Sequence, residues 1–207
     1  LQAAMQAGNL NAVSLVTYYL HRIKEFDQNG LNAVMELNPN ALTDAASLDA
    51  DRAAGRLRGP LHGIPVLLKD NISTVGPMHT TAGAAVFMDH VSDHDAFIVT
   101  QLQQAGAVIL GKANLSEFAN WVSPTLPNGF SAVGGQTISP YDPEIDPTGS
   151  STGSAVAVSA NLVTLSVGTE TSGSIISPTA RNGVVGMYPS RGLVSRDGIV
   201  PLAESQD

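Results

Sequence analysis

Residues 148–174 read TGSSTGSAVAVSANLVTLSVGTETSGS, and this stretch decides how the chain folds. Its centre carries no charge and predicts a buried helix over 155–160 followed by a buried strand over 162–167. A turn rich in glycine and hydroxyl side chains lies at each end. Because glycine loosens the backbone and a buried hydroxyl without a partner is costly, we expect such turns where something uses them.

The same alternation of helices and apolar strands extends outward through the rest of the chain. The spacing of apolar residues predicts helices over 10–27, 38–53 and 97–105, and strands over 31–37, 63–68 and 107–110. This order is typical of a layered α/β fold. No internal repeat, low-complexity tract or interior linker divides the chain, so we expect residues 1–207 to form a single domain.

Composition excludes several classes of protein. The 207 residues carry a net charge of −8 with few lysines, which argues against nucleic acid or an anionic membrane as a partner. No apolar run approaches the roughly 20 residues of a membrane span, and no signal peptide opens the chain. We therefore expect a cytoplasmic protein. Because the chain begins at Leu1 and stops at Asp207, shortly after the apolar residues 199–202, we interpret it as the N-terminal part of a longer polypeptide.

Metal and cofactor chemistry is not expected either. The chain has no cysteine, which excludes disulfides, thiolate catalysis and cysteine-bound zinc. His90, Asp93 and His94 have a spacing that could suggest metal ligands, but their segment is typical of a solvated loop and helix start. We predict no metal site and no cofactor.

The serine turns allow several interpretations. Residues 149–153 match the G-x-S-x-G pattern of a hydrolase nucleophile centred on Ser151, which needs a preceding strand and a later histidine. This interpretation is disfavoured, because two prolines in residues 141–147 are incompatible with a central strand before the turn, and all five histidines precede Ser151. A phosphate-binding loop is disfavoured because the Gly-Lys-Ser/Thr ending is absent. Taken singly, each serine is more often a helix N-cap than a catalyst.

Lys69 changes this balance, because it ends the apolar run 63–68. A serine hydroxyl is a poor nucleophile until a base takes its proton, and burial lowers the pKa of a lysine toward the range of a useful base. Without the serine turns, Lys69 would be interpreted as a strand-end lysine that reaches solvent. Together, these residues are the parts of a nucleophilic hydrolase that works without histidine.

The chain resembles the amidase signature family of amide hydrolases nearly from end to end. The resemblance rests on residues 59–71, 111–118, 182–186 and 192–196, together with the two serine turns. The loop ending at 134–137 is most similar to the peptide amidase branch. The resemblance implies a layered α/β/α fold with a central mixed sheet, here incomplete at its C-terminus.

The resemblance also assigns roles. It implies a Ser-cisSer-Lys triad of Ser174 as nucleophile, Ser150 as bridging serine and Lys69 as base. It implies hydrogen-bond donors for the oxyanion from the backbone N–H groups of four residues, Thr171, Ser172, Gly173 and Ser174. It further implies that an acyl pocket is lined by Ala119, Asn120 and Trp121. We also expect Ser151 to hydrogen-bond Lys69 and to be a substrate-binding residue together with those three. Core packing is an equal alternative for Trp121.

We therefore expect an amidase that cleaves a linear carboxamide, such as a C-terminal peptide amide or an aryl or alkyl amide, through an acyl-enzyme. One alternative is the glutaminase component of an aminoacyl-tRNA amidotransferase, from which the longer stretch 123–136 differs. A second is a non-catalytic binding protein on the same fold, which is disfavoured because the triad is intact. The expected partner is a small-molecule or peptide amide, and the oligomeric state stays open.

Overall fold

The computed structural model describes residues 1–207, apart from the side chain of Asn29. Its centre is a four-stranded sheet in the order β1-β3-β2-β6. The strands are β1 (Val34–Leu37), β2 (Pro65–Lys69), β3 (Val108–Ala113) and β6 (Leu165–Val167). Strands β3, β2 and β6 are parallel, and β1 is antiparallel to β3. A second sheet pairs β4 (Phe130–Ser131) with β5 (Gly135–Gln136), within the long loop.

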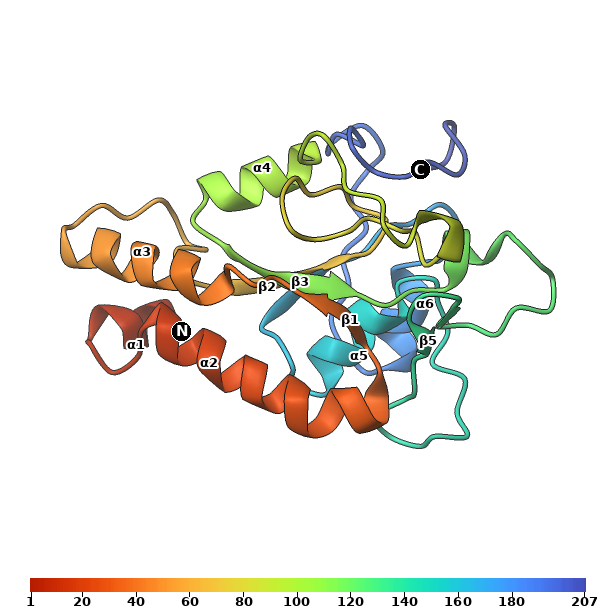
Figure 1. The fold of residues 1–207 in the computed structure, drawn as a ribbon, viewed down its shortest axis with the longest axis horizontal. Helices are drawn as coiled ribbons and strands as arrows, with labels where there is room; N and C mark the ends of the chain where they lie inside the picture. Colours follow the sequence, from red (N-terminus) through yellow and green to blue (C-terminus); the bar gives the residue numbers. More distant parts are fainter.

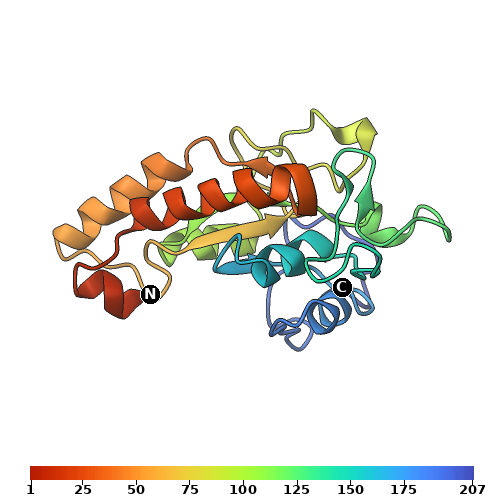
Figure 2. The same cartoon turned by 90° about the horizontal axis from the view of Figure 1, so that it is seen from below.

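Helices cover both faces of the large sheet. They are α1 (Gln2–Gln6), α2 (Ala12–Arg22), α3 (Ala41–Ala53), α4 (Phe97–Gln104), α5 (Thr152–Ser159) and α6 (Ile176–Arg181). One buried cluster joins α2, α3 and α5 to one face, and a second joins α4 to the other (Figures 1 and 2). This arrangement confirms the predicted layered α/β fold with a mixed sheet. Within the described residues, no helix combines the length and apolar character needed to cross a membrane.

A bulge in β3 decides which side chains share a face with Lys69. Opposite Val66 and Leu67 of β2 lie Ile109 and Gly111, so Leu110 has no partner in this ladder. Successive side chains of a strand point to opposite faces, and the extra residue therefore inverts the faces for the rest of β3. Gly111 is required at this point because a Cβ there would lie 2.2 Å from the backbone oxygen of Glu36 in β1.

Several predicted boundaries need correction. The strand predicted over 107–110 continues to Ala113, because the bulge carries it through further buried residues. The helix predicted over 10–27 is α2 followed by a π-helix, Ile23–Leu31, so the next strand begins at Val34 rather than Leu31. The helix start is fixed by Asn11, whose side chain accepts from the N–H of Ser14 at 2.7 Å.

The last predicted strand also differs. The sequence predicts a buried strand over 162–167, but β6 covers only Leu165–Val167 and lies at the edge of the sheet. Leu165 is 43% exposed there. Leu162 and Val163 are buried in the core before the strand begins. The apolar run therefore supplies a core segment and an edge strand, which periodicity alone does not separate.

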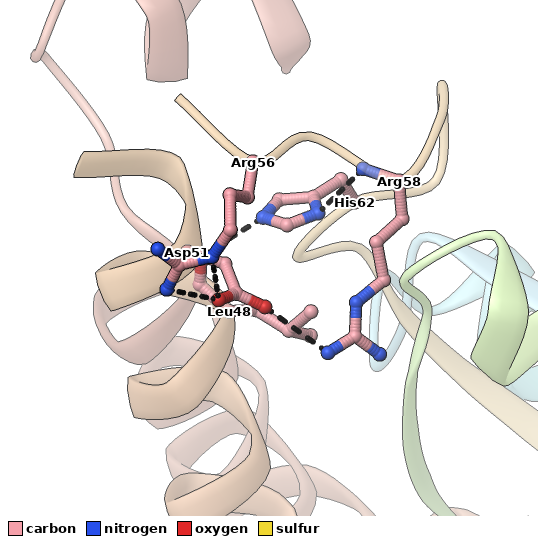
Figure 3. A network of polar contacts seen from close by, with 5 residues as sticks. All are labelled: Leu48, Asp51, Arg56, Arg58 and His62. Atoms are coloured by element: carbon pink, nitrogen blue, oxygen red, sulfur yellow. Dashed lines mark hydrogen bonds and ion pairs between the residues drawn. The ribbon is translucent and has the colours of Figure 1, made fainter. Parts of the chain in front are cut away.

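A buried histidine fixes the loop that precedes β2 (Figure 3). The Nε2 of His62 lies 2.8 Å from the backbone oxygen of Leu48 in α3, and its Nδ1 accepts from the N–H of Arg58 at 3.2 Å. Asp51 accepts from both Arg56 and Arg58 beside it. With a hydrogen bond at each ring nitrogen, His62 joins α3 to the loop before β2, and its role here is structural.

Candidate active site

Lys69 ends β2 inside the molecule, with no exposed surface. Its Nζ lies 2.8 Å from Ser150 Oγ, 2.9 Å from Thr169 Oγ1 and 3.4 Å from the backbone oxygen of Thr169. Burial lowers the pKa of Lys69 to about 7, although the charge of Glu170 acts in the opposite direction. A substantial fraction of the amine is therefore neutral near pH 7, as a general base requires.

Ser150 lies in a turn packed against the segment that follows β3. The peptide bond between Gly149 and Ser150 is cis. The backbone oxygen of Ser150 accepts from the N–H of Ser116 at 3.1 Å. A Cβ at Gly149 would lie 2.5 Å from the hydroxyl of Ser116, so this close approach requires glycine. The first serine turn is therefore held against the sheet by its backbone, with the Ser150 hydroxyl directed at Lys69.

Ser174 lies just before α6 and is 9% exposed. Its backbone oxygen accepts from the N–H of Ser151 at 3.1 Å, which joins the two serine turns. Within the described residues, no hydrogen bond links the hydroxyls of Ser174 and Ser150. The structure thus brings Lys69 and Ser150 into contact and joins Ser174 to the first serine turn through a backbone hydrogen bond.

The start of α6 carries the predicted oxyanion donors. Among the described groups, the backbone N–H groups of Thr171, Ser172 and Ser174 have no acceptor. The N–H of Gly173 instead donates to the Glu170 carboxylate at 3.0 Å. The same carboxylate also accepts from the next two N–H groups of the helix start, those of residues 175 and 176, at 2.7 and 2.9 Å. An acidic side chain is favoured there by the partial positive charge of a helix N-terminus, and it leaves three free donors rather than four.

The predicted contact between Ser151 and Lys69 is wrong. Ser151 Oγ instead donates to the backbone oxygen of Thr169 at 3.0 Å and accepts from its N–H at 3.1 Å. The second hydroxyl partner of the lysine is Thr169, which the sequence motifs did not single out. Its position inside the second serine turn was the available signal. Asn71 Nδ2 donates to the same Thr169 hydroxyl at 2.9 Å.

A cavity of about 460 Å³ opens beside these residues. Ala119 and Ser151 line it, as do Asn71 and residues 169–171. The cavity lies between the serine turns and the C-terminal segment 184–202.

Asn120 and Trp121 do not line this cavity, contrary to the prediction. Trp121 is 69% exposed, which also excludes its alternative role in the core. The cause is a turn in which Phe118, Ala119 and Asn120 have φ values of 43°, 56° and 69°. This left-handed turn directs the chain away from the cavity after Ala119, and Asn120 Nδ2 donates to Asn128 at 3.2 Å.

A second buried lysine serves another part of the fold. Lys112 Nζ donates to the backbone oxygen of Ile72 at 2.6 Å and to Thr80 Oγ1 at 3.0 Å. Burial lowers the pKa of Lys112 to about 8, opposed first by the charge of Asp70. Burial raises the pKa of Asp70, which accepts from the N–H and the hydroxyl of Thr81. These contacts hold the loop after β2 in place.

The residues with metal-ligand spacing lie apart from this site. In the part of the chain that the structure describes, no three side chains of His, Cys, Asp or Glu gather in a way that could hold a metal ion. His94 pairs with Asp93 at 2.6 Å, and both are exposed.

Comparison with known proteins identifies the family of the chain. Residues 14–207 match the Amidase family. A Schizosaccharomyces pombe protein named "Putative amidase" is 46% identical over 207 residues, which are all of this chain and 35% of that protein. A component of the Glutamyl-tRNA(Gln) amidotransferase of Symbiobacterium thermophilum is 43% identical over 97% of this chain and 40% of its own length.

A solved structure is similar as well. The native peptide amidase of Stenotrophomonas maltophilia superposes with a TM-score of 0.94 and 55% identity, over 97% of this chain and 41% of that one. The chain thus spans about two fifths or less of the length of these relatives. The family match covers nearly all of its residues, and the fold is shared. The chain belongs to the Amidase family.

Proposed function

We propose that this protein hydrolyses linear carboxamides through an acyl-enzyme formed on Ser174. The observation that carries the proposal is the contact of 2.8 Å between Lys69 Nζ and Ser150 Oγ, in a site that lowers the pKa of the lysine to about 7. A neutral amine in contact with a buried hydroxyl is the arrangement that a base relay to a serine nucleophile needs.

In the first half of the reaction, Ser174 Oγ attacks the carbonyl carbon of the amide. Its proton passes to Ser150 Oγ, while the proton of Ser150 passes to Lys69 Nζ. The negative charge on the former carbonyl oxygen meets the free N–H groups of Thr171, Ser172 and Ser174. The proton then returns through Ser150 to the leaving nitrogen, the carbon–nitrogen bond breaks, and ammonia or an amine departs.

In the second half, water attacks the ester carbonyl of the acylated Ser174. The same relay takes a proton from that water and returns it to the Ser174 oxygen as the ester bond breaks. The carboxylic acid is released and the enzyme is regenerated. The Lys69–Ser150 contact of the relay is already formed. The relay also requires a contact between the hydroxyls of Ser174 and Ser150, and rotation of the Ser174 side chain would supply it.

C-terminal peptide amides are the substrate class we favour. The support is the 55% identity with the peptide amidase of Stenotrophomonas maltophilia and the apolar and hydroxyl lining of the cavity beside the triad. Glutamine hydrolysis within an amidotransferase is the second candidate, supported by the 43% identity with the Symbiobacterium thermophilum amidotransferase component.

Ammonia release from a panel of peptide amides, simple carboxamides and glutamine tests the proposal. We expect release from peptide amides by the parent, and its loss in Ser174→Ala and Lys69→Ala. Lys24→Ala, which removes an exposed lysine, is the matched control and should retain the parent rate. Release from glutamine alone would favour the amidotransferase function. If the parent is folded but silent on the whole panel, a binding role is favoured instead.

A further inference from the structure

The contacts of Lys69 suit both protonation states that the proposed relay requires. As an ammonium, the group has three N–H donors, and three oxygens surround it: Ser150 Oγ and two oxygens of Thr169. As a neutral amine it has two N–H groups and one lone pair. The Thr169 oxygens can then accept both N–H groups and leave the lone pair facing Ser150. Proton exchange is therefore confined to the Ser150 contact while both Thr169 oxygens keep their places.

The two Thr169 oxygens are held by different residues. The backbone oxygen is fixed by Ser151, whose hydroxyl bonds both the N–H and the carbonyl of Thr169. These bonds leave Oγ1 free, because its position depends on rotation about χ1. If Oγ1 rotated away, one N–H of the fully buried Lys69 would lose its acceptor, and the amine could turn out of line with Ser150.

Asn71 is the residue that restrains this rotation. It follows Lys69 by two positions, is 6% exposed, and donates through Nδ2 to Thr169 Oγ1 at 2.9 Å. Its Oδ1 is buried and has no hydrogen-bond partner among the described residues. Among the described residues, the side chain of Asn71 makes one hydrogen bond, and that bond is to the partner of the lysine.

We propose that Asn71 is a positioning residue for the Lys69 base, acting through the hydroxyl of Thr169. This inference rests on the proposed function, because it assigns Asn71 a place in that relay. It goes beyond the triad in a specific way: the direction in which the lysine exchanges its proton depends on a side chain that forms no hydrogen bond with Lys69, Ser150 or Ser174.

Four variants test the proposal: Asn71→Ala, Thr169→Val, their combination, and Asn71→Asp. We expect Asn71→Ala to lower kcat by roughly 10- to 100-fold, part of the effect of a general base, with KM within about twofold of the parent. The double variant should be no slower than Thr169→Val alone, because both changes remove one chain of contacts. Asn38→Ala is the matched control: it removes an asparagine bond of 2.8 Å to the backbone of Ile109, far from the lysine, and should leave kcat unchanged.

The pH profile supplies a readout that a purely structural role would not move. In Asn71→Ala the ammonium loses a fixed acceptor, so the acid limb of kcat should shift to lower pH. Asn71→Asp keeps the shape and still restrains the Thr169 hydroxyl, but adds a negative charge near Lys69. Its acid limb should therefore shift to higher pH. Opposite shifts from two substitutions at one position would support the assignment.

The rate at which a fluorophosphonate labels Ser174 separates this inference from the proposed function, since it needs no amide substrate. A parent that labels, together with an Asn71→Ala protein that is folded by circular dichroism and labels equally fast, would overturn the inference alone. Multiplicative losses in the double variant, or a raised KM with unchanged kcat, would overturn it too. A parent that neither hydrolyses amides nor labels would overturn the proposed function and this inference with it.

Discussion

Lys112 faces Leu68 across the parallel ladder of β2 and β3, so it lies on the opposite face of the sheet from Lys69, one residue further along β2. Both lysines are fully buried, and burial lowers the pKa of each, to about 7 for Lys69 and about 8 for Lys112. Their partners differ, however. Only Lys69 contacts a serine turn, and only this lysine is therefore suited to the proposed base role.

The pH dependence of hydrolysis should reveal which lysine is the base. The neutral amine is the active form, so kcat/KM should rise with pH through about 7, where Lys69 loses its proton, and then level off. Steady-state rates from pH 5 to 9 measure this limb. Lys112→Met should leave its midpoint near 7 if the protein folds. A midpoint near 8 that disappears in Lys112→Met would contradict the assignment.

The same burial of Lys69 should also make the free energy of unfolding depend on pH. Between about pH 7 and 10.5 the unfolded chain holds the Lys69 proton and the folded chain does not, so the free energy of unfolding rises with pH across this window. Below pH 7 the folded chain bears the full free-energy cost of burying the charged lysine. Lys69→Met removes this cost, so the variant should be more stable than the parent at low pH. This difference in the free energy of unfolding should shrink by several kcal/mol from pH 6 to 10, at about 1.4 kcal/mol per pKa unit.

Urea unfolding of parent and Lys69→Met at several pH values measures this difference. Lys24→Met, at an exposed position, is the control and should show a gap that does not vary with pH. A constant gap for Lys69→Met as well would mean that burial does not lower the pKa of this lysine.

Glu170→Gln should affect both the helix start and the base. The carboxylate accepts three backbone N–H groups at the start of α6, and an amide in its place can accept fewer and adds donors, which should cost about 1–3 kcal/mol of stability. The negative charge of Glu170 raises the pKa of Lys69, so its loss should move the acid limb of kcat/KM to lower pH.

Thermal unfolding and a pH–rate profile of Glu170→Gln test both effects. Glu144→Gln, at an exposed loop position, serves as the control for a lost surface charge. A lower stability with an unmoved acid limb would show that Glu170 acts on the helix alone.

His62→Ala should weaken the fold and leave catalysis intact. The substitution removes the bonds to Leu48 and Arg58 beneath the loop that enters β2, and we expect a loss of about 1–3 kcal/mol in the free energy of unfolding. His62 precedes β2, whereas Lys69 ends it, so kcat should not change. Denaturant unfolding and hydrolysis rates test this, with His21→Ala at an exposed position as the control. A fall in kcat with unchanged stability would contradict the structural role of His62.

The predicted fold is confirmed where it depends on contiguous motifs. Lys69 ends a strand of apolar residues, and the serine turns flank a helix and a strand, so their meeting near the carboxyl ends of the parallel strands β2 and β6 follows from connectivity. The apolar periodicity did not predict the bulge at Leu110, because Ile109 and Gly111 on either side are apolar or small and do not mark an extra residue. For this reason the predicted end of β3 lies too early.

Contacts between hydroxyl groups were harder to predict. Ser151 and Thr169 are both plausible partners for a lysine, and only the three-dimensional arrangement shows that Ser151 binds the backbone of Thr169 rather than the amine. The left-handed turn at 118–120 contains no glycine, the residue that ordinarily signals such a backbone. The family resemblance predicted Asn120 and Trp121 in the pocket, and nothing in the local sequence indicates that this turn keeps them from lining the cavity.

The contact between Lys69 and Ser150 joins positions 81 residues apart in the sequence. It can form only after β2 has paired with its neighbours and the first serine turn has docked on Ser116. Until then the lysine is hydrated and keeps its proton, and the serines have no base. The proposed base and its serine partner are therefore not assembled in a partly folded chain, and the proposed reactivity arises only when these two segments come together.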